Sequence, residues 1–225
     1  MAVYPQRRTS EEDDMSEGVS TMSMSYHDVE KLVVLYPNHQ IELKDGKIII
    51  MGPSDGTSGE IGMCFGSLLG AWVYNHALGQ VFDASTGFRF PNGDLLSPDV
   101  SFVSRGRLKQ VPRTYLSVVP ELIVEIKSSQ DRVRELEEKI ALFLSQGVQV
   151  GILIDPDAHT VSVFRSGGPD KHADTGAPVS QVTTLRDGDT LTIPDLFPGW
   201  EIPVTSIWPP VYQTRQEGHW LQPRG

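Results

Sequence analysis

The sequence contains a single cysteine, Cys64. One thiol cannot form a disulfide within the chain, and it cannot build a metal cluster that needs several cysteines. The composition therefore argues against redox chemistry and against a zinc site held by thiolates.

Long hydrophobic runs are also missing. No apolar stretch approaches the length of a membrane-spanning helix, and the first 25 residues lack the apolar core that a signal peptide needs. We therefore expect a cytoplasmic protein that does not bind membranes.

Basic residues are scarce. The chain holds 19 Lys and Arg against 29 Asp and Glu, a formal net charge of -10. Residues 1–25 carry five of the acids and two of the arginines, so the rest of the chain is acidic as well. This balance disfavours strong non-specific binding to a polyanion, although a local basic loop can still contact one.

The chain is long enough for one domain with a hydrophobic core. Residues 1–25 are polar and show no periodicity, which predicts a disordered acidic tail. Order is expected over residues 26–208, followed by a loose C-terminal tail at 209–225. The sequence contains no internal repeat.

Helical and strand patterns alternate within 26–208. Asp45-Gly46 between two β-rich runs predicts a hairpin. Two amphipathic helices are expected on the following hydrophobic stripes: Ile61, Phe65, Leu68, Leu69 and Trp72 in the first, and Val133, Leu136, Ile140 and Phe143 in the second. With the strands between and after them, these helices predict an α/β protein in which helices cover a mixed sheet.

One predicted strand, in "PELIVEIKSSQDR", carries an acid and an amine. Because strand side chains alternate, Glu125 and Lys127 are expected on one face together with Ile123. A buried charged pair is costly unless it binds something or takes part in chemistry. The preceding strand-like run "LLSPDVSFV" adds Asp99. Two strand-borne carboxylates suit a Mg²⁺ ion, for which Mn²⁺ could substitute, and Lys127 beside them could orient the attacking water.

The individual motifs are not specific. Glu-x-Lys recurs at Glu42/Lys44, interpreted as the exposed edge of a hairpin, and at Glu137/Lys139, interpreted as a solvated helix face. Pro-Asp recurs at 156–157, 169–170 and 194–195, all read as turns. The set 99, 125 and 127 differs because it occupies consecutive strands followed by a packing helix.

Several segments in a fixed order carry a family resemblance: "IELKDGKIIIMGPS", "TGFRFPNGDLLSPD", "SPDVSFV", "PELIVEIKSSQDR", "GVQVGILIDPDAHTVSVFR" and "LRDGDTLTIPDLFPGWEIP". Together they resemble the bacterial Uma family of putative restriction endonucleases, a branch of the PD-(D/E)XK nuclease superfamily. The resemblance runs from about Tyr26 to Trp208. It implies a restriction-endonuclease-like core with helices flanking a central mixed sheet and an extra N-terminal hairpin.

The resemblance also implies a function and a set of residues. The implied activity is Mg²⁺-dependent endonucleolytic hydrolysis of DNA, with the superfamily Asp at Asp99 and its Glu and Lys at Glu125 and Lys127. An acid often found on the first core helix would be Glu60. A homodimer is a further hypothesis, drawn from the way such nucleases cut two strands.

Other interpretations stay open at this point. The connector "SRGRLKQVPR" gathers Arg105, Arg107, Lys109 and Arg113, which could hold a phosphate backbone near the metal or be a solvated basic loop. The chain could instead be a non-catalytic module that binds nucleic acid or a protein partner on the same fold. Hydrolysis of a different phosphodiester is a third hypothesis.

Overall fold

The computed structural model describes residues 23–166 and 179–212. Most of the predicted acidic tail, and of the predicted loose C-terminal tail, lies outside these ranges. The helices are α1 (Tyr26–Leu35), α2 (Gly56–Asn75), α3 (Val133–Ser145) and the short 3-10 helix η1 (Val204–Ser206). The strands are β1 (Gln40–Lys44), β2 (Lys47–Met51), β3 (Gly79–Asp83), β4 (Phe88–Arg89), β5 (Leu95–Leu96), β6 (Val100–Ser104), β7 (Leu122–Ile126), β8 (Val150–Asp155), β9 (Thr160–Ser166), β10 (Val179–Arg186), β11 (Thr190–Thr192) and β12 (Glu201–Pro203).

The predicted mixed sheet is confirmed. Its strand order is β10-β9-β8-β7-β6-β3, in which β7 and β8 are parallel and the other neighbours are antiparallel. The parallel pair is joined through α3, as a crossover connection requires. Strands β7 and β8 are buried along their whole length, so the centre of the domain lies there.

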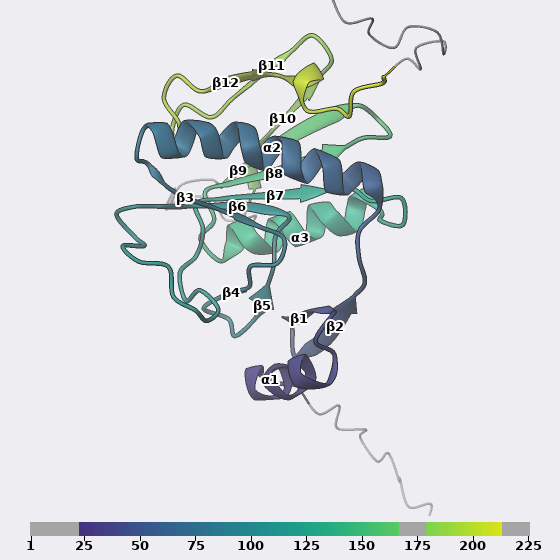
Figure 1. Cartoon of the computed structure of the whole chain (residues 1–225), viewed down its shortest axis with the longest axis vertical. Helices are drawn as coiled ribbons and strands as arrows, with labels where there is room; N and C mark the ends of the chain where they lie inside the picture. Colours follow the sequence, from purple (N-terminus) through teal and green to yellow (C-terminus); the bar gives the residue numbers. More distant parts are fainter. Residues whose placement is uncertain (1–22, 167–178, 213–225) are drawn as a thin grey trace, which may run out of the picture.

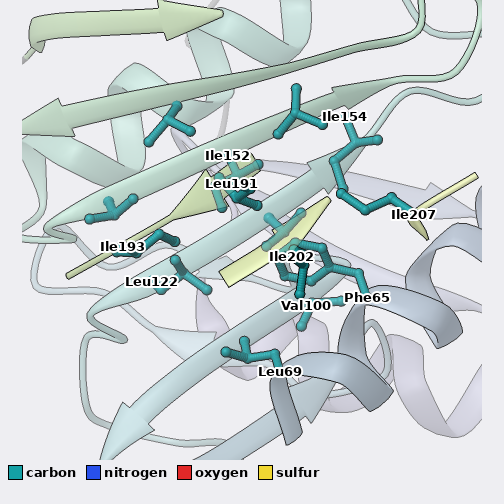
Figure 2. Packing of buried hydrophobic residues seen from close by; sticks show 14 of the residues in the cluster. Phe65, Leu69, Val100, Leu122, Ile152, Ile154, Leu191, Ile193, Ile202 and Ile207 are labelled. Atoms are coloured by element: carbon teal, nitrogen blue, oxygen red, sulfur yellow. The ribbon is translucent and has the colours of Figure 1, made fainter. Parts of the chain in front are cut away.

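The two long helices cover opposite faces of this sheet (Figure 1). Helix α2 contributes Phe65 and Leu69 to a core that also includes Leu122 of β7 and Ile202 of β12 (Figure 2). Ile61 of α2 belongs to the same core. The predicted stripe on α2 is therefore confirmed, with Leu68 and Trp72 packed at its margin.

Helix α3 packs on the other face, where Ile140 and Phe143 meet Ile123. The prediction that Val133 belongs to this buried stripe is wrong, because Val133 is the first residue of the helix and is 36% exposed. Among the described helices, not one combines the length and apolar character needed to cross a bilayer.

The N-terminal hairpin is part of a second, smaller sheet of order β2-β1-β5-β4. Its turn is formed by Asp45 and Gly46, both at positive φ (49° and 70°), as the Asp-Gly signal predicts. Strand β1 pairs with β2 on one side and with β5 on the other, through Leu43 and Leu95. Strand β1 is therefore internal, and its central residues are buried.

Candidate active site

Asp99 and Glu125 lie opposite each other at one end of the main sheet. Strands β6 and β7 are antiparallel with Val100 facing Val124, so the same register carried one step further brings Asp99, just before β6, opposite Glu125. Asp99 is fixed by a 2.7 Å hydrogen bond that its Oδ2 accepts from the Ile126 N–H. Glu125 is only 4% exposed. The two carboxylates predicted from the sequence are thus brought together.

Burial sets the protonation of both groups. Loss of hydration raises the pKa of Asp99, against the lowering effect of the hydrogen bond from Ile126. Burial also raises the pKa of Glu125 to about 8, and the negative charges of Asp99 and Glu42 act in the same direction.

Lys139 of α3 is the cation that the fold places against Glu125. Its Nζ lies 3.1 Å from each carboxylate oxygen of Glu125 and 3.3 Å from Oε1 of Glu42. Burial alone would lower the pKa of Lys139, but the attraction of Glu125, Glu42 and Asp99 outweighs it and raises the pKa. The interpretation of Lys139 as part of a solvated helix face is wrong, because this side of α3 packs on the sheet.

Glu42 joins the same cluster from the smaller sheet. It is 2% exposed, and its Oε1 accepts a 2.8 Å hydrogen bond from the Ser97 N–H in addition to the contact with Lys139. Its interpretation as an exposed hairpin edge is wrong, because β5 covers the second side of β1. Glu42 and Lys139 are therefore the members of this cluster that the sequence reasoning missed.

Lys127 and Glu60 lie in a different hollow. Lys127 follows the last residue of β7, and its Nζ bonds Oδ2 of Asp157 in the turn after β8. A hollow of about 550 Å³ is lined by Lys127 and Asp157 together with Glu60, Asp55 and others. The structure thus divides the predicted set in two: Asp99 with Glu125, and Lys127 with an exposed Glu60.

Asp55 joins the start of α2 to the segment that follows β7. Its Oδ1 accepts a 3.0 Å hydrogen bond from the Ser58 N–H, which caps the helix, and its Oδ2 accepts one of 2.8 Å from the Ser129 N–H. These bonds to Ser58 and Ser129 lower the pKa of Asp55 from 3.8 to about 2.

This bridge predicts a pH-dependent contribution to stability. Because the folded pKa lies below the unfolded one, the contribution is present above pH 3.8 and disappears as the pH falls toward 2. The difference in urea midpoint between wild type and Asp55→Ala should therefore shrink between pH 4 and pH 2. A difference that stays constant from pH 5 to pH 2 would contradict this assignment.

The basic connector lies at the opposite end of β6 from Asp99. Its first arginine, Arg105, is six residues beyond Asp99, about 20 Å along an extended strand. Arg107 contacts the buried Glu121 at 3.4 Å. The structure therefore does not bring Arg105, Arg107, Lys109 or Arg113 to the two carboxylates.

The donor atoms at Asp99 and Glu125 fit a hard divalent cation. Lys139 donates a hydrogen bond to Oε2 of Glu125, and its Nζ lies at the same distance of 3.1 Å from the buried Oε1, which accepts no hydrogen bond of good geometry from the described residues. Within that part of the chain, no group of three or more His, Cys, Asp or Glu side chains is arranged for a metal. Mg²⁺ accepts one or two carboxylates and completes its shell with water and phosphate oxygens, so this pair suffices.

Comparison with known protein families identifies the family to which the chain belongs. The sequence profile of Uma2, described as a putative restriction endonuclease, matches residues 25–205. The chain belongs to this family. The resemblance noted in the sequence is thereby confirmed, and the family supports a nuclease. No curated protein matches the chain.

Solved structures give the same fold. A putative nuclease belonging to DUF820 from Anabaena variabilis ATCC 29413 matches with a TM-score of 0.61 and 20% identity, over 74% of this chain and 88% of that one. The restriction-endonuclease-like core predicted for this Uma2 protein is confirmed. A chain of the DrdV-DNA complex matches at a TM-score of 0.33 and 14% identity, over 53% of this chain and 9% of that one, which is too low to carry an argument.

Proposed function

We propose that this Uma2 protein is a Mg²⁺-dependent endonuclease that hydrolyses phosphodiester bonds in DNA, with Asp99 and Glu125 as the cation ligands. The observation that carries the proposal is that the antiparallel register of β6 and β7 brings Asp99 next to the buried Glu125, with the Asp99 carboxylate held by the Ile126 N–H. Membership of a family described as putative restriction endonucleases supports the same reading.

The residues of the chain then have distinct roles. Bound at the two carboxylates, Mg²⁺ would stabilise negative charge on the phosphate and supply a water of lowered pKa. Lys139 holds the Glu125 carboxylate in place from α3, and Glu42 anchors Lys139 from β1. Lys139 is therefore a positioning residue in this proposal.

Lys127 is proposed to act on the water or on the phosphate. It lies two residues after Glu125, at the mouth of the neighbouring hollow, where an exposed Asp157 holds its ammonium group. The Asp157 side chain is 73% exposed whereas that of Lys127 is 13% exposed, so Asp157 can turn into solvent and leave the Lys127 ammonium group to a phosphate. Glu60, in the same hollow, is proposed only as a neighbour of Lys127.

The test is a cleavage assay on supercoiled, linear, single-stranded and branched DNA with Mg²⁺, Mn²⁺ or chelator. We expect metal-dependent cutting that falls by about 10²-fold in Lys127→Met, as is usual when a group that assists proton transfer is lost. The matched control is Lys44→Met, which removes the lysine of the rival Glu-x-Lys pair and should leave the rate unchanged.

Two results would count against this proposal. If folded wild-type protein cuts no DNA with either metal, the non-catalytic module or another phosphodiester becomes the better account. If Lys127→Met cuts as fast as Lys44→Met, the nuclease remains but Lys127 has no part in the chemistry.

A further inference from the structure

A groove lies along α2, and Asp99 is one of its lining residues. Its volume is about 830 Å³, and its lining includes Asp99 and Ile126 near one end and Tyr74 of the last helical turn. The lining also includes residues 37–40, after α1, and residues 81–85, at the end of β3 and beyond. If the proposed function holds, this groove is where part of the substrate must lie, and its chemistry then indicates the substrate class.

The lining of the groove is unsuited to a phosphate backbone. Neither lysine nor arginine occurs among its lining residues, and two of them, Asp83 and Asp99, are acids. Proteins that follow a nucleic-acid backbone line their channel with cations. The part of a nucleic acid that can enter here is therefore the uncharged part, the bases.

The shape of the groove also suits flat uncharged groups. Gly59, Gly62 and Gly66 lie along the wall formed by α2, so that wall carries no side chain at these three positions. A Cβ at Gly59 would meet nothing within 4 Å, and one at Gly66 would meet a single Val100 methyl at 3.9 Å. The ring of Tyr74, 59% exposed, offers an aromatic surface on which a base could stack.

We propose that this groove receives unpaired bases, and that the substrate of the Asp99–Glu125 site is therefore single-stranded or frayed nucleic acid. The volume is that of a small-molecule site, enough for one or two nucleotides of one strand. In an uninterrupted duplex the bases are stacked and paired, so placing one in the groove first costs the energy of extruding it. The proposal rests on the proposed function and narrows its substrate.

Groove-filling variants of the full chain test this. Gly59→Leu and Gly66→Leu place a side chain in the groove, and leucine favours a helix more than glycine does, so the fold should survive. Ala71→Leu adds bulk at an exposed position of α2 that does not line the groove and is the matched control. The readout is fluorescence anisotropy of a labelled single strand and of a blunt duplex without metal, from 50 to 200 mM salt.

We expect the single strand to bind about tenfold or more tightly than the duplex, with a loss of similar size in both groove variants and none in Ala71→Leu. Over this salt range the affinity should change by less than about tenfold, whereas six to ten phosphate contacts would change it by about 10³ to 10⁵. Equal binding of the duplex, a steep salt dependence, or unaffected groove variants would overturn the proposal.

Cleavage by the same proteins separates the two proposals. If the wild type cuts a continuous duplex and the groove variants cut it equally well, the groove assignment is contradicted and the proposed nuclease activity is supported. If no DNA is cut but single-strand binding depends on the groove as expected, the proposed nuclease activity is contradicted, and the assignment of the groove as a binding site for unpaired bases is supported.

Discussion

Replacement of Lys139 by methionine is expected to lower the free energy of unfolding by about 3–5 kcal/mol, because it leaves two buried acids without their cation. Glu42 and Glu125 are 2% and 4% exposed, and both contact the Lys139 ammonium group. The deficit should be smaller below about pH 8, the pKa of Glu125 with Lys139 in place, than above it, because a protonated Glu125 does not need the cation.

Urea unfolding monitored by circular dichroism provides the measurement, and two further variants make it specific. Lys127→Met removes a lysine whose partner Asp157 is largely solvent-exposed, so the change should stay within about 1 kcal/mol. The double variant Lys139→Met/Glu125→Gln should recover part of the lost stability, because Glu42 is then the remaining buried acid without its cation. If Lys139→Met costs no more than Lys127→Met, Lys139 does not hold the buried acids as described.

Glu125→Gln and Asp99→Asn should each slow DNA cleavage by about 10³-fold, since the site would lose charge stabilisation of about 4 kcal/mol. Both substitutions preserve side-chain shape, and Asn at 99 can still accept the hydrogen bond that Ile126 donates. The folded state should therefore persist, and the rate of metal-dependent cleavage is the quantity to measure.

Glu121 supplies the matched control for this experiment. It too is a buried acid beside β7, 4% exposed, but it lies at the other end of the strand, where it accepts a 2.6 Å hydrogen bond from the Ser104 hydroxyl. Glu121→Gln should cut DNA at the wild-type rate. Cleavage by Glu125→Gln within tenfold of Glu121→Gln would remove Glu125 from the site.

Local sequence patterns predicted most of the fold because they record which faces are buried. The alternation in β7 predicted Ile123 and Glu125 on one face and Leu122 and Val124 on the other, and the structure places Ile123 in the cluster with α3 and Leu122 and Val124 in the cluster with α2. Asp99 and Glu125 were expected to meet if their strands were neighbours, and the antiparallel pairing of β6 with β7 brings them together. Both inferences need only a strand period of two and adjacent strands.

Glu42 was misplaced because its environment depends on a distant pairing. The hairpin turn at Asp45-Gly46 is a local signal, whereas the pairing of Leu43 with Leu95, which makes β1 internal, joins residues 52 positions apart. No pattern within β1 reports that second neighbour. An acid in such a strand becomes a candidate only once the smaller sheet is known.

Lys139, in contrast, had a usable signal. It lies three residues after Leu136 and four before Phe143, both on the buried stripe of α3, so the helical period already placed it against the sheet. The position of the Lys127 side chain had no such signal, because strand alternation stops at Ile126, the last residue of β7. Beyond that point the side chain turns to Asp157, and no period could have predicted its direction.

The most direct test of the central claim is calorimetric titration of the metal-free protein with Mn²⁺ and Mg²⁺, with Asp99→Asn, Glu125→Gln and Lys127→Met measured alongside. If Asp99 and Glu125 hold the cation, wild type and Lys127→Met bind Mn²⁺ alike, and the two carboxylate variants lose that binding. Binding of Mn²⁺ by Asp99→Asn and Glu125→Gln with wild-type affinity would contradict the claim and place any cation elsewhere.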